Sequence, residues 1–218
     1  AAFGAGGVIY LTSLIFNNIG LSATDIGLGF TISAIIGTVT RLFTGNYLNK
    51  TGKIQFPIVT SSILSIAASL CLIFSRDTFL YIIGQSFVGA AAGIYWPAAE
   101  FGVPYFCHPI ETRKAYALVR SSEALGIFLG VFLGGYMTNF LYSKSIFIND
   151  IFCMLVITYL ISRNSSSIKR NLENFQKKLV DPINQGQLKW NKNSTIIILS
   201  ILLITTSLAL IQVTLPLD

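Results

Sequence analysis

The sequence predicts an all-α polytopic membrane protein, and three observations carry the prediction. First, 53% of the 218 residues are hydrophobic and only 11% are charged, less than half the charged share of an average soluble domain. Second, five segments contain no Asp, Glu, Lys or Arg. They are residues 1–24, 54–75, 78–99, 124–143 and 193–217. Third, each is long enough to cross the hydrocarbon core of a bilayer, which takes about 20 residues of helix.

These segments lead us to expect seven membrane-spanning helices. Their expected ranges are 1–18, 25–48, 54–75, 78–103, 116–140, 145–162 and 194–215. A soluble protein with very hydrophobic core helices is the alternative. Core helices of soluble proteins are usually shorter and keep one polar face, and the five uncharged segments leave no such face. The lipid bilayer is therefore the expected surrounding.

The positive charges in the short loops predict the orientation. Loops that face the cytoplasm carry an excess of Lys and Arg. Eleven such residues lie in the loops on one side, at 45–53, 104–115 and 163–193. The other side has two, Arg76 and Lys144. We expect a multi-pass protein of the plasma (inner) membrane, with its N-terminus and the 163–193 loop in the cytoplasm.

The charge pattern also divides the chain into three parts. Residues 163–193 hold seven basic and two acidic residues, which suits a cytoplasmic loop beside anionic lipid. A nucleic-acid-binding tail is the less favoured alternative. We therefore expect a six-helix bundle at 1–162, a basic central loop at 163–193, and a seventh helix at 194–218. That helix would begin a second half that is otherwise missing.

The polar turn GNYLNKTGK, residues 45–53, separates the second and third expected helices. Arg41, Gly45 and Asn49 are spaced four apart and so share one helix face. A glycine on such a face lets a neighbouring helix approach closely. Gly52 permits a tight turn. The turn is thus predicted to be both a hairpin and a contact surface.

This turn resembles the loop motif of the major facilitator superfamily, G-x-x-x-D-R/K-x-G-R/K. Gly45, Lys50, Gly52 and Lys53 match it, while Asn49 replaces the acidic residue. The resemblance extends over nearly the whole chain. It implies a fold whose six-helix half consists of two inverted three-helix units, as in many carriers. It also implies a latch that closes the cytoplasmic side against the second half, here without the acidic charge.

A weak internal repeat agrees with the inverted units, since GAGGVIY at 4–10 is similar to GAAAGIY at 89–95. A family motif of proton-coupled members, R-x-x-Q-G, is incomplete in the fourth expected helix. Gly89 is present, but Gln85 stands where the arginine would be. Proton coupling through that arginine is therefore not expected.

The fifth expected helix contains GIFLGVFLGG, which resembles the antiporter motif G-x-x-x-G-P-x-x-G-G. Gly126, Gly130, Gly134 and Gly135 match, and Val131 replaces the proline. Glycines at this spacing form a stripe for close helix contact. Simple packing and an export-type antiporter both remain open at this point.

Charged groups inside a membrane are expensive and are candidates for function. On the fourth helix, Gln85, Gly89, Trp96 and Glu100 share one face, which would line a polar cavity. Trp96 offers a surface for flat or cationic substrates. Alternatively, Glu100 lies near the cytoplasmic end and reaches water.

On the fifth helix, Arg120 and Glu123 are three residues apart and can neutralise one another. Glu123 is either the proton-coupling group or part of a structural ion pair. Tyr10 and Tyr95 are further candidates for contact with the substrate. The carboxylates of the predicted outer ends, Asp25, Asp77 and Asp150, are expected to be solvated.

The resemblance favours a secondary active transporter of small molecules that works by alternating access and exports its substrate by proton exchange. Uptake by symport or uniport is the alternative, and a receptor or a membrane-embedded enzyme is more remote. One histidine and three scattered cysteines predict no metal site, cofactor or catalytic residues. The expected partners are a small-molecule substrate, protons, lipid and the second half, but no nucleic acid.

Overall fold

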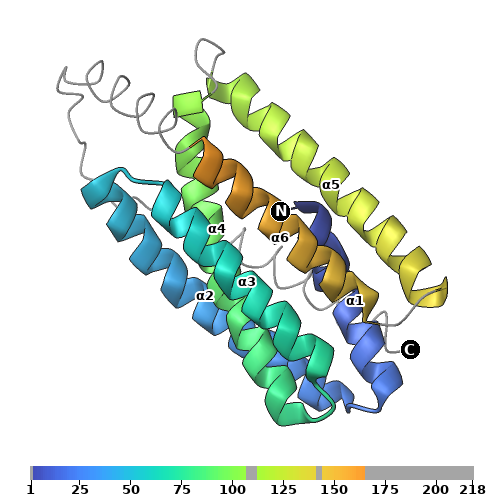
Figure 1. Ribbon diagram of the computed structural model, residues 1–218. Helices are drawn as coiled ribbons and strands as arrows, with labels where there is room; N and C mark the ends of the chain where they lie inside the picture. The colour runs from blue at the N-terminus through green and yellow to red at the C-terminus, as the bar shows by residue number, and fades with distance from the viewer. Residues whose placement is uncertain (1, 107–111, 141–143, 165–218) are drawn as a thin grey trace, which may run out of the picture.

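The computed structural model describes residues 2–106, 112–140 and 144–164 (Figure 1). These form six helices: α1 Ala2–Ile19, α2 Ala23–Thr51, α3 Gln55–Phe74, α4 Thr78–Phe106, α5 Thr112–Phe140 and α6 Ser145–Arg163. Each is long and apolar enough to cross a membrane, so the predicted all-α polytopic class is confirmed. The expected seventh helix, most of the 163–193 loop and Cys107 lie outside the described residues.

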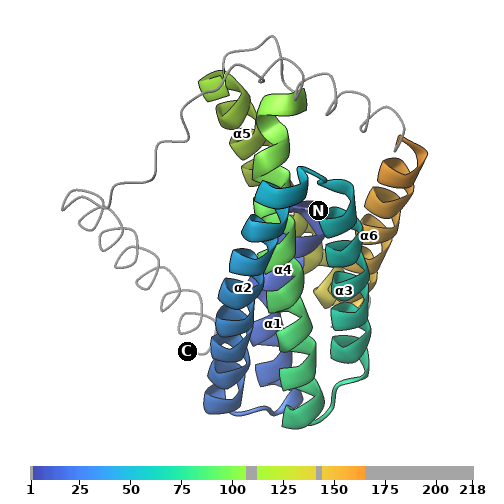
Figure 2. The same cartoon turned by 90° about the vertical axis from the view of Figure 1, so that its left-hand side faces the viewer.

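The helices pack as two groups that meet along α3 and α6. In one group α2 and α3 lie against α4, and in the other α1 lies against α5 and α6. Figure 2 shows α2, α4 and α3 side by side, with α6 next to α3. The main contact between the groups, that of α3 with α6, joins helices that are distant in sequence. The division into inverted three-helix units stays a prediction.

The helix boundaries follow from local capping chemistry. At the start of α2, the backbone N–H of Asp25 donates to the Ser22 hydroxyl at 3.1 Å, so the helix begins at Ala23, two residues earlier than expected. At its end, Gly52 adopts a left-handed conformation with φ 63° and its N–H donates to the Leu48 carbonyl at 2.8 Å. A glycine takes this conformation without steric cost. The predicted tight turn at Gly52 is therefore confirmed.

Two groups of buried side chains close the ends of the bundle. The larger group centres on Phe16, whose ring centroid lies 4.6 Å from Tyr81 and 6.2 Å from Phe147. The smaller group contains Leu48 and Ile54 and adjoins the α2–α3 turn. We call the end with this turn the basic end, because it carries Lys50, Lys53, Arg113, Lys114 and Arg163.

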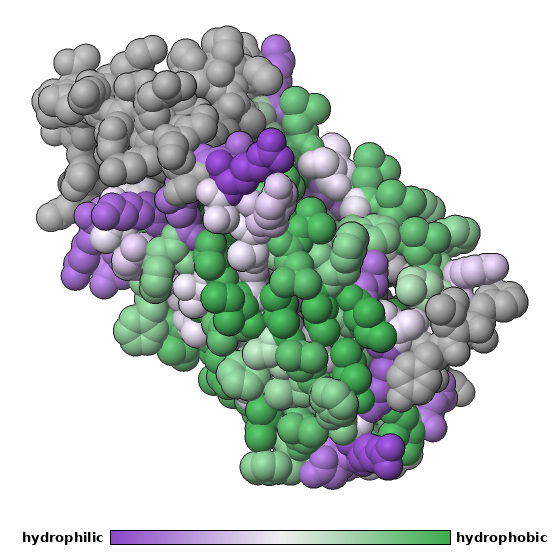
Figure 3. Space-filling view, viewed as in Figure 1, coloured by the Kyte–Doolittle hydropathy of each residue, from purple (hydrophilic) through white to green (hydrophobic). Residues whose placement is uncertain are grey.

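Between α2 and α4 the backbones approach closely. A Cβ at Gly37 would lie 3.0 Å from the Gly89 carbonyl oxygen, and a Cβ at Gly89 would overlap the Ser33 backbone. Dispersion contacts between backbones replace side-chain packing here. On the visible face, hydrophobic side chains cover the middle of the molecule and hydrophilic ones gather toward its ends (Figure 3). This distribution suits a bilayer.

Candidate functional site

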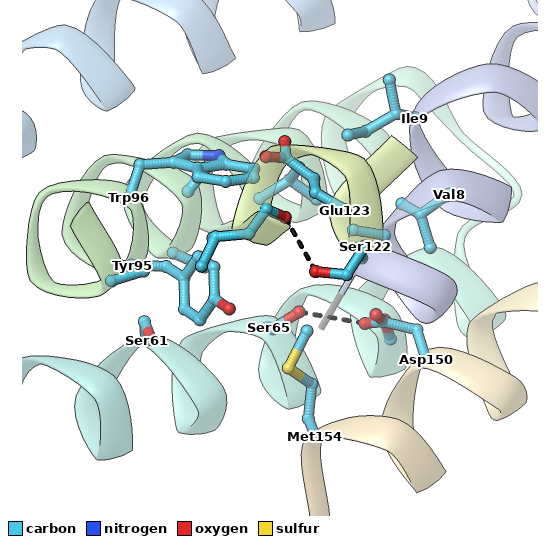
Figure 4. Close-up of a pocket in the computed structure, with 18 residues that line it drawn as sticks. Val8, Ile9, Ser61, Ser65, Tyr95, Trp96, Ser122, Glu123, Asp150 and Met154 are labelled. Atoms are coloured by element: carbon cyan, nitrogen blue, oxygen red, sulfur yellow. Dashed lines mark hydrogen bonds between the residues drawn. The ribbon is translucent and has the colours of Figure 1, made fainter. Parts of the chain in front are cut away.

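A cavity of about 250 Å³ lies in the middle of the bundle, between the two buried groups. We call it the central cavity. Five helices line it, α1, α3, α4, α5 and α6. The close-up in Figure 4 shows Tyr95 and Trp96 of α4 on one side and Asp150 and Met154 of α6 on another. The wall is completed by small or aliphatic residues of α1, α4 and α5, by Ser122 and Glu123 of α5, and by Ser61, Ser65 and Ser69 of α3.

A second cavity of about 490 Å³, which we call the basic-end cavity, opens between α2, α4 and α5. It is lined by Arg41, Gly45, Trp96, Pro97, Glu100, Arg120 and Glu123. Trp96 and Glu123 line both cavities. These two side chains therefore form the boundary between the middle of the bundle and the basic-end cavity.

Arg120 contacts both side chains of this boundary. Its Nη1 donates to the Glu123 carboxylate at 2.8 Å, and its Nη2 donates to Glu100 of α4. The guanidinium carbon lies 5.5 Å from the centre of the Trp96 ring, close enough for a cation–π contact. The Glu123 side chain is 17% exposed, whereas those of Arg120 and Glu100 are about half exposed at 53% and 49%. Glu123 is thus the most sheltered of the three charges.

The expected pairing of Arg120 with Glu123 is present, and the structure adds Glu100 to it. Of the expected cavity-lining residues, Tyr95 and Trp96 line the central cavity and Glu100 lines the basic-end cavity. Tyr10 and Gln85 line neither. Tyr10 is 37% exposed, and Gln85 is buried beside Tyr81.

The loop motif divides between the basic-end cavity and the surface. Arg41 and Gly45 line that cavity, and Asn49, Lys50 and Lys53 are exposed. At Gly45, an added Cβ would meet no described atom beyond its own helix within 4 Å. No helix of the described bundle approaches closely there, and the expected close contact stays a prediction.

The glycine stripe of α5 packs against α1. A Cβ at Gly126 would lie 3.0 Å from the Ala2 Cβ, one at Gly130 would overlap the Phe3 carbonyl oxygen, and one at Gly134 would lie 2.9 Å from Leu11. Gly135 is different, because a Cβ there would meet nothing described within 4 Å. Close helix contact is a sufficient structural role for the first three glycines.

Asp150 is where the expectation from sequence is wrong. Rather than being solvated, it is 2% exposed and accepts hydrogen bonds from Ser65 at 2.9 Å and Ser69 at 2.8 Å. Asp77 is exposed, as expected, and Asp25 is half-buried in the α2 cap. The error has a physical cause. Asp150 is the sixth residue of α6, which places it more than one turn inside the helix, where its carboxylate contacts α3. The four-residue spacing of Ser61, Ser65 and Ser69 was the available signal.

Within the described ranges, no group of three His, Cys, Asp or Glu side chains comes together to hold a metal ion. The described thiols, Cys71 and Cys153, are free and half-buried. The chemistry of the site therefore rests on the carboxylates, on Arg120 and on the serine and aromatic side chains of the central cavity.

Comparison with known proteins agrees with this architecture. No curated protein matches the chain. The family model described as Major Facilitator Superfamily matches residues 1–217, which is almost the whole chain. Together with six helices able to span a membrane, this match shows that the chain belongs to the major facilitator superfamily, a family of secondary transporters.

Proposed function

We propose that this protein exports a small molecule in exchange for protons, with Glu123 as the proton-carrying group. The observation that supports this most is the position of Glu123 on the walls of both cavities. A carboxylate at such a boundary meets the central cavity and the basic-end cavity from one place. It can therefore take up a proton on one side and release it on the other with little movement.

Glu100, the second partner of Arg120, allows protonation of Glu123 to change the contacts of Arg120. When Glu123 is ionised, Arg120 binds it and Glu100 together. A proton on Glu123 removes the charge and weakens its hydrogen bond to Arg120, because charge-assisted bonds are about twice as strong as neutral ones. Glu100 is then the remaining ionised partner of Arg120. Loading and release of the proton would thus alter the contact between α4 and α5 beside the central cavity, where the substrate would bind.

The orientation belongs to the same proposal. The basic end would face the cytoplasm of a plasma (inner) membrane, following the excess of Lys and Arg there. Arg41 and Gly45 would face the second half of the carrier across the basic-end cavity, and the two halves would rock about the central cavity in alternating access. The open space beside Gly45 supports a contact surface that the described helices leave uncovered.

The test is transport by the complete chain encoded by the gene, reconstituted in vesicles with imposed and reversed pH gradients. A pH-sensitive dye would report proton movement on addition of each compound of a small-molecule panel. We expect proton movement opposite to that of the substrate, and its loss in Glu123→Gln. The matched control is Asp77→Asn, which neutralises an exposed carboxylate at the other end of the bundle.

Each other outcome contradicts part of the proposal. Proton-coupled flux that is unchanged in Glu123→Gln would remove Glu123 from the coupling step. Substrate and proton moving in the same direction would replace export with uptake by symport. Binding of a compound with no flux under either gradient would favour a receptor.

A further inference from the structure

We propose that Asp150, Ser65 and Ser69 bind the primary ammonium group of a small amphipathic cation in the central cavity. This inference rests on the proposed function only in taking the central cavity as the substrate site, for which it names a substrate class. The site lies on α3 and α6, away from the Arg120 cluster of α4 and α5. It therefore adds a recognition site to the one assigned to proton coupling.

The first observation is an incompletely satisfied buried carboxylate. Asp150 is 2% exposed. Its Oδ2 accepts both serine hydroxyls, whereas its Oδ1 has no hydrogen-bond partner in the described part of the chain. Within the same residues, the ion pairs of the structure all involve Arg120 and none reaches Asp150. Burying a carboxylate without a cation or enough donors is costly. A positively charged ligand would offset this cost.

The second observation is the geometry around the carboxylate. Each serine hydroxyl donates its single hydrogen to Oδ2 and keeps lone pairs that can accept. Oδ1 and the two serine oxygens thus offer three acceptors, which is the number of N–H donors on a primary ammonium. Gly4 of α1 packs closely against this carboxylate, because a Cβ there would lie 2.7 Å from Oδ1.

The third observation is the charge of the cavity wall. Its lining residues include two carboxylates, Glu123 and Asp150, and no Lys, Arg or His. Arg120 forms ion pairs with Glu123 and Glu100. Asp150 is the carboxylate of the cavity wall that pairs with no described Lys or Arg, and it favours a positively charged ligand.

The rest of the wall indicates an organic cation rather than a bare metal ion. Tyr95 and Trp96 present aromatic rings, and Met154 and Val8 present apolar side chains. Aromatic faces attract cations and cover flat apolar groups. A sodium ion would use the oxygen atoms but not this apolar surface. A volume of about 250 Å³ suits a ligand the size of an arylalkylamine.

The test is equilibrium binding to the complete chain in lipid nanodiscs, measured by calorimetry with three probes. These are 2-phenylethylammonium, its uncharged analogue 2-phenylethanol, and sodium chloride. We expect saturable binding of the ammonium, weaker binding of the alcohol, and none of sodium. Asp150→Asn should weaken ammonium binding about tenfold or more, since a charge-assisted contact is lost, and leave binding of the alcohol unchanged.

Asp77→Asn is the matched control and should bind the ammonium like the unmodified chain. Should Asp150→Asn not fold, as judged by gel filtration and circular dichroism, Ser69→Ala provides the second test. It keeps the carboxylate and should weaken ammonium binding a few-fold.

Four results would overturn the proposal: no ammonium binding by the unmodified chain, equal losses for ammonium and alcohol, no loss in a folded variant, or saturable sodium binding that displaces the ammonium. Because binding needs no gradient, a chain that binds the ammonium without transporting it contradicts the proposed export alone. Conversely, transport of other compounds with no binding of the ammonium contradicts only this inference.

Discussion

The ammonium of Lys144 donates a hydrogen bond to the Ile73 carbonyl oxygen across 2.9 Å and a second one to the carbonyl of Ser75. Lys144 precedes α6, and the two carbonyls belong to the end of α3. The contact thus satisfies backbone acceptors that a helix leaves free at its C-terminus. It also places a positive charge at the negative end of the helix dipole.

We expect Lys144→Met to lower the free energy of unfolding by about 2 kcal/mol, because two carbonyls lose a charged donor. The methionine keeps most of the apolar volume beside Phe16, over whose ring the ammonium lies. Thermal unfolding in detergent would measure the change. Arg76→Met is the control, since Arg76 is exposed, and an equal loss there would contradict the capping role.

The same lysine predicts a dependence of stability on pH. Loss of hydration on burial lowers the pKa of Lys144 from its ordinary 10.5, and the nearby Arg76 adds to the effect. Between the lowered value and 10.5 the unfolded chain binds more protons than the folded one, so stability should rise with pH in this alkaline window. Melting temperatures measured up to pH 10.5 should show a slope that Lys144→Met reduces. An identical slope in both chains would show that Lys144 does not contribute.

The α5 glycines provide a matched pair of substitutions. Gly130→Ala should destabilise the bundle by about 1–3 kcal/mol, since the added methyl overlaps the Phe3 backbone of α1 and overpacking carries a cost of this order. Gly135→Ala meets no described atom and should be neutral, or stabilising by up to about 1 kcal/mol through helix propensity. Thermal unfolding of both variants would compare them. Equal destabilisation would contradict the α1–α5 contact.

Gly52→Ala should destabilise the α2–α3 turn. A residue with a Cβ at φ 63° is strained by about 1–2 kcal/mol, and Gly52→Asn should cost less, because asparagine tolerates this conformation better. Gly45→Ala is the control, as its Cβ meets no described atom. The melting temperatures should fall in the order Gly45→Ala, Gly52→Asn, Gly52→Ala, and a reversal of the last two would contradict the assigned conformation.

A double substitution separates the two interpretations of Glu123. Arg120→Gln should destabilise the bundle by about 1 kcal/mol, because it leaves a sheltered carboxylate without its cation. Adding Glu123→Gln removes the sheltered charge, and Glu100 is half exposed and stays hydrated, so most of that stability should be recovered. If Glu123 carries the proton, coupled transport stays lost in the double variant. Recovery of both stability and coupled transport would make the pair purely structural.

Several features of the fold were predictable because they depend on short stretches of chain. Four of the six described helices, α1, α3, α4 and α5, contain the uncharged runs. The turn at Gly52 follows from the freedom of glycine to adopt a left-handed conformation, and the pairing of Arg120 with Glu123 follows from helical spacing. The partner Glu100, by contrast, comes from another helix. The hydrogen bond between Ser69 and Asp150 joins residues 81 positions apart. No local pattern brings such groups together.

By itself, the sequence determined that the chain is a bundle of membrane helices and which residues carry the family motifs, because hydrophobicity, length and spacing act locally along each helix. Only the tertiary structure decided that Asp150 is buried rather than solvated and that Glu123 borders two cavities. It also decided that three α5 glycines face α1, whereas Gly135 and Gly45 face open space. These outcomes depend on how each helix is rotated against its neighbours. In an apolar surrounding, close backbone packing and the pairing of buried polar groups set that rotation.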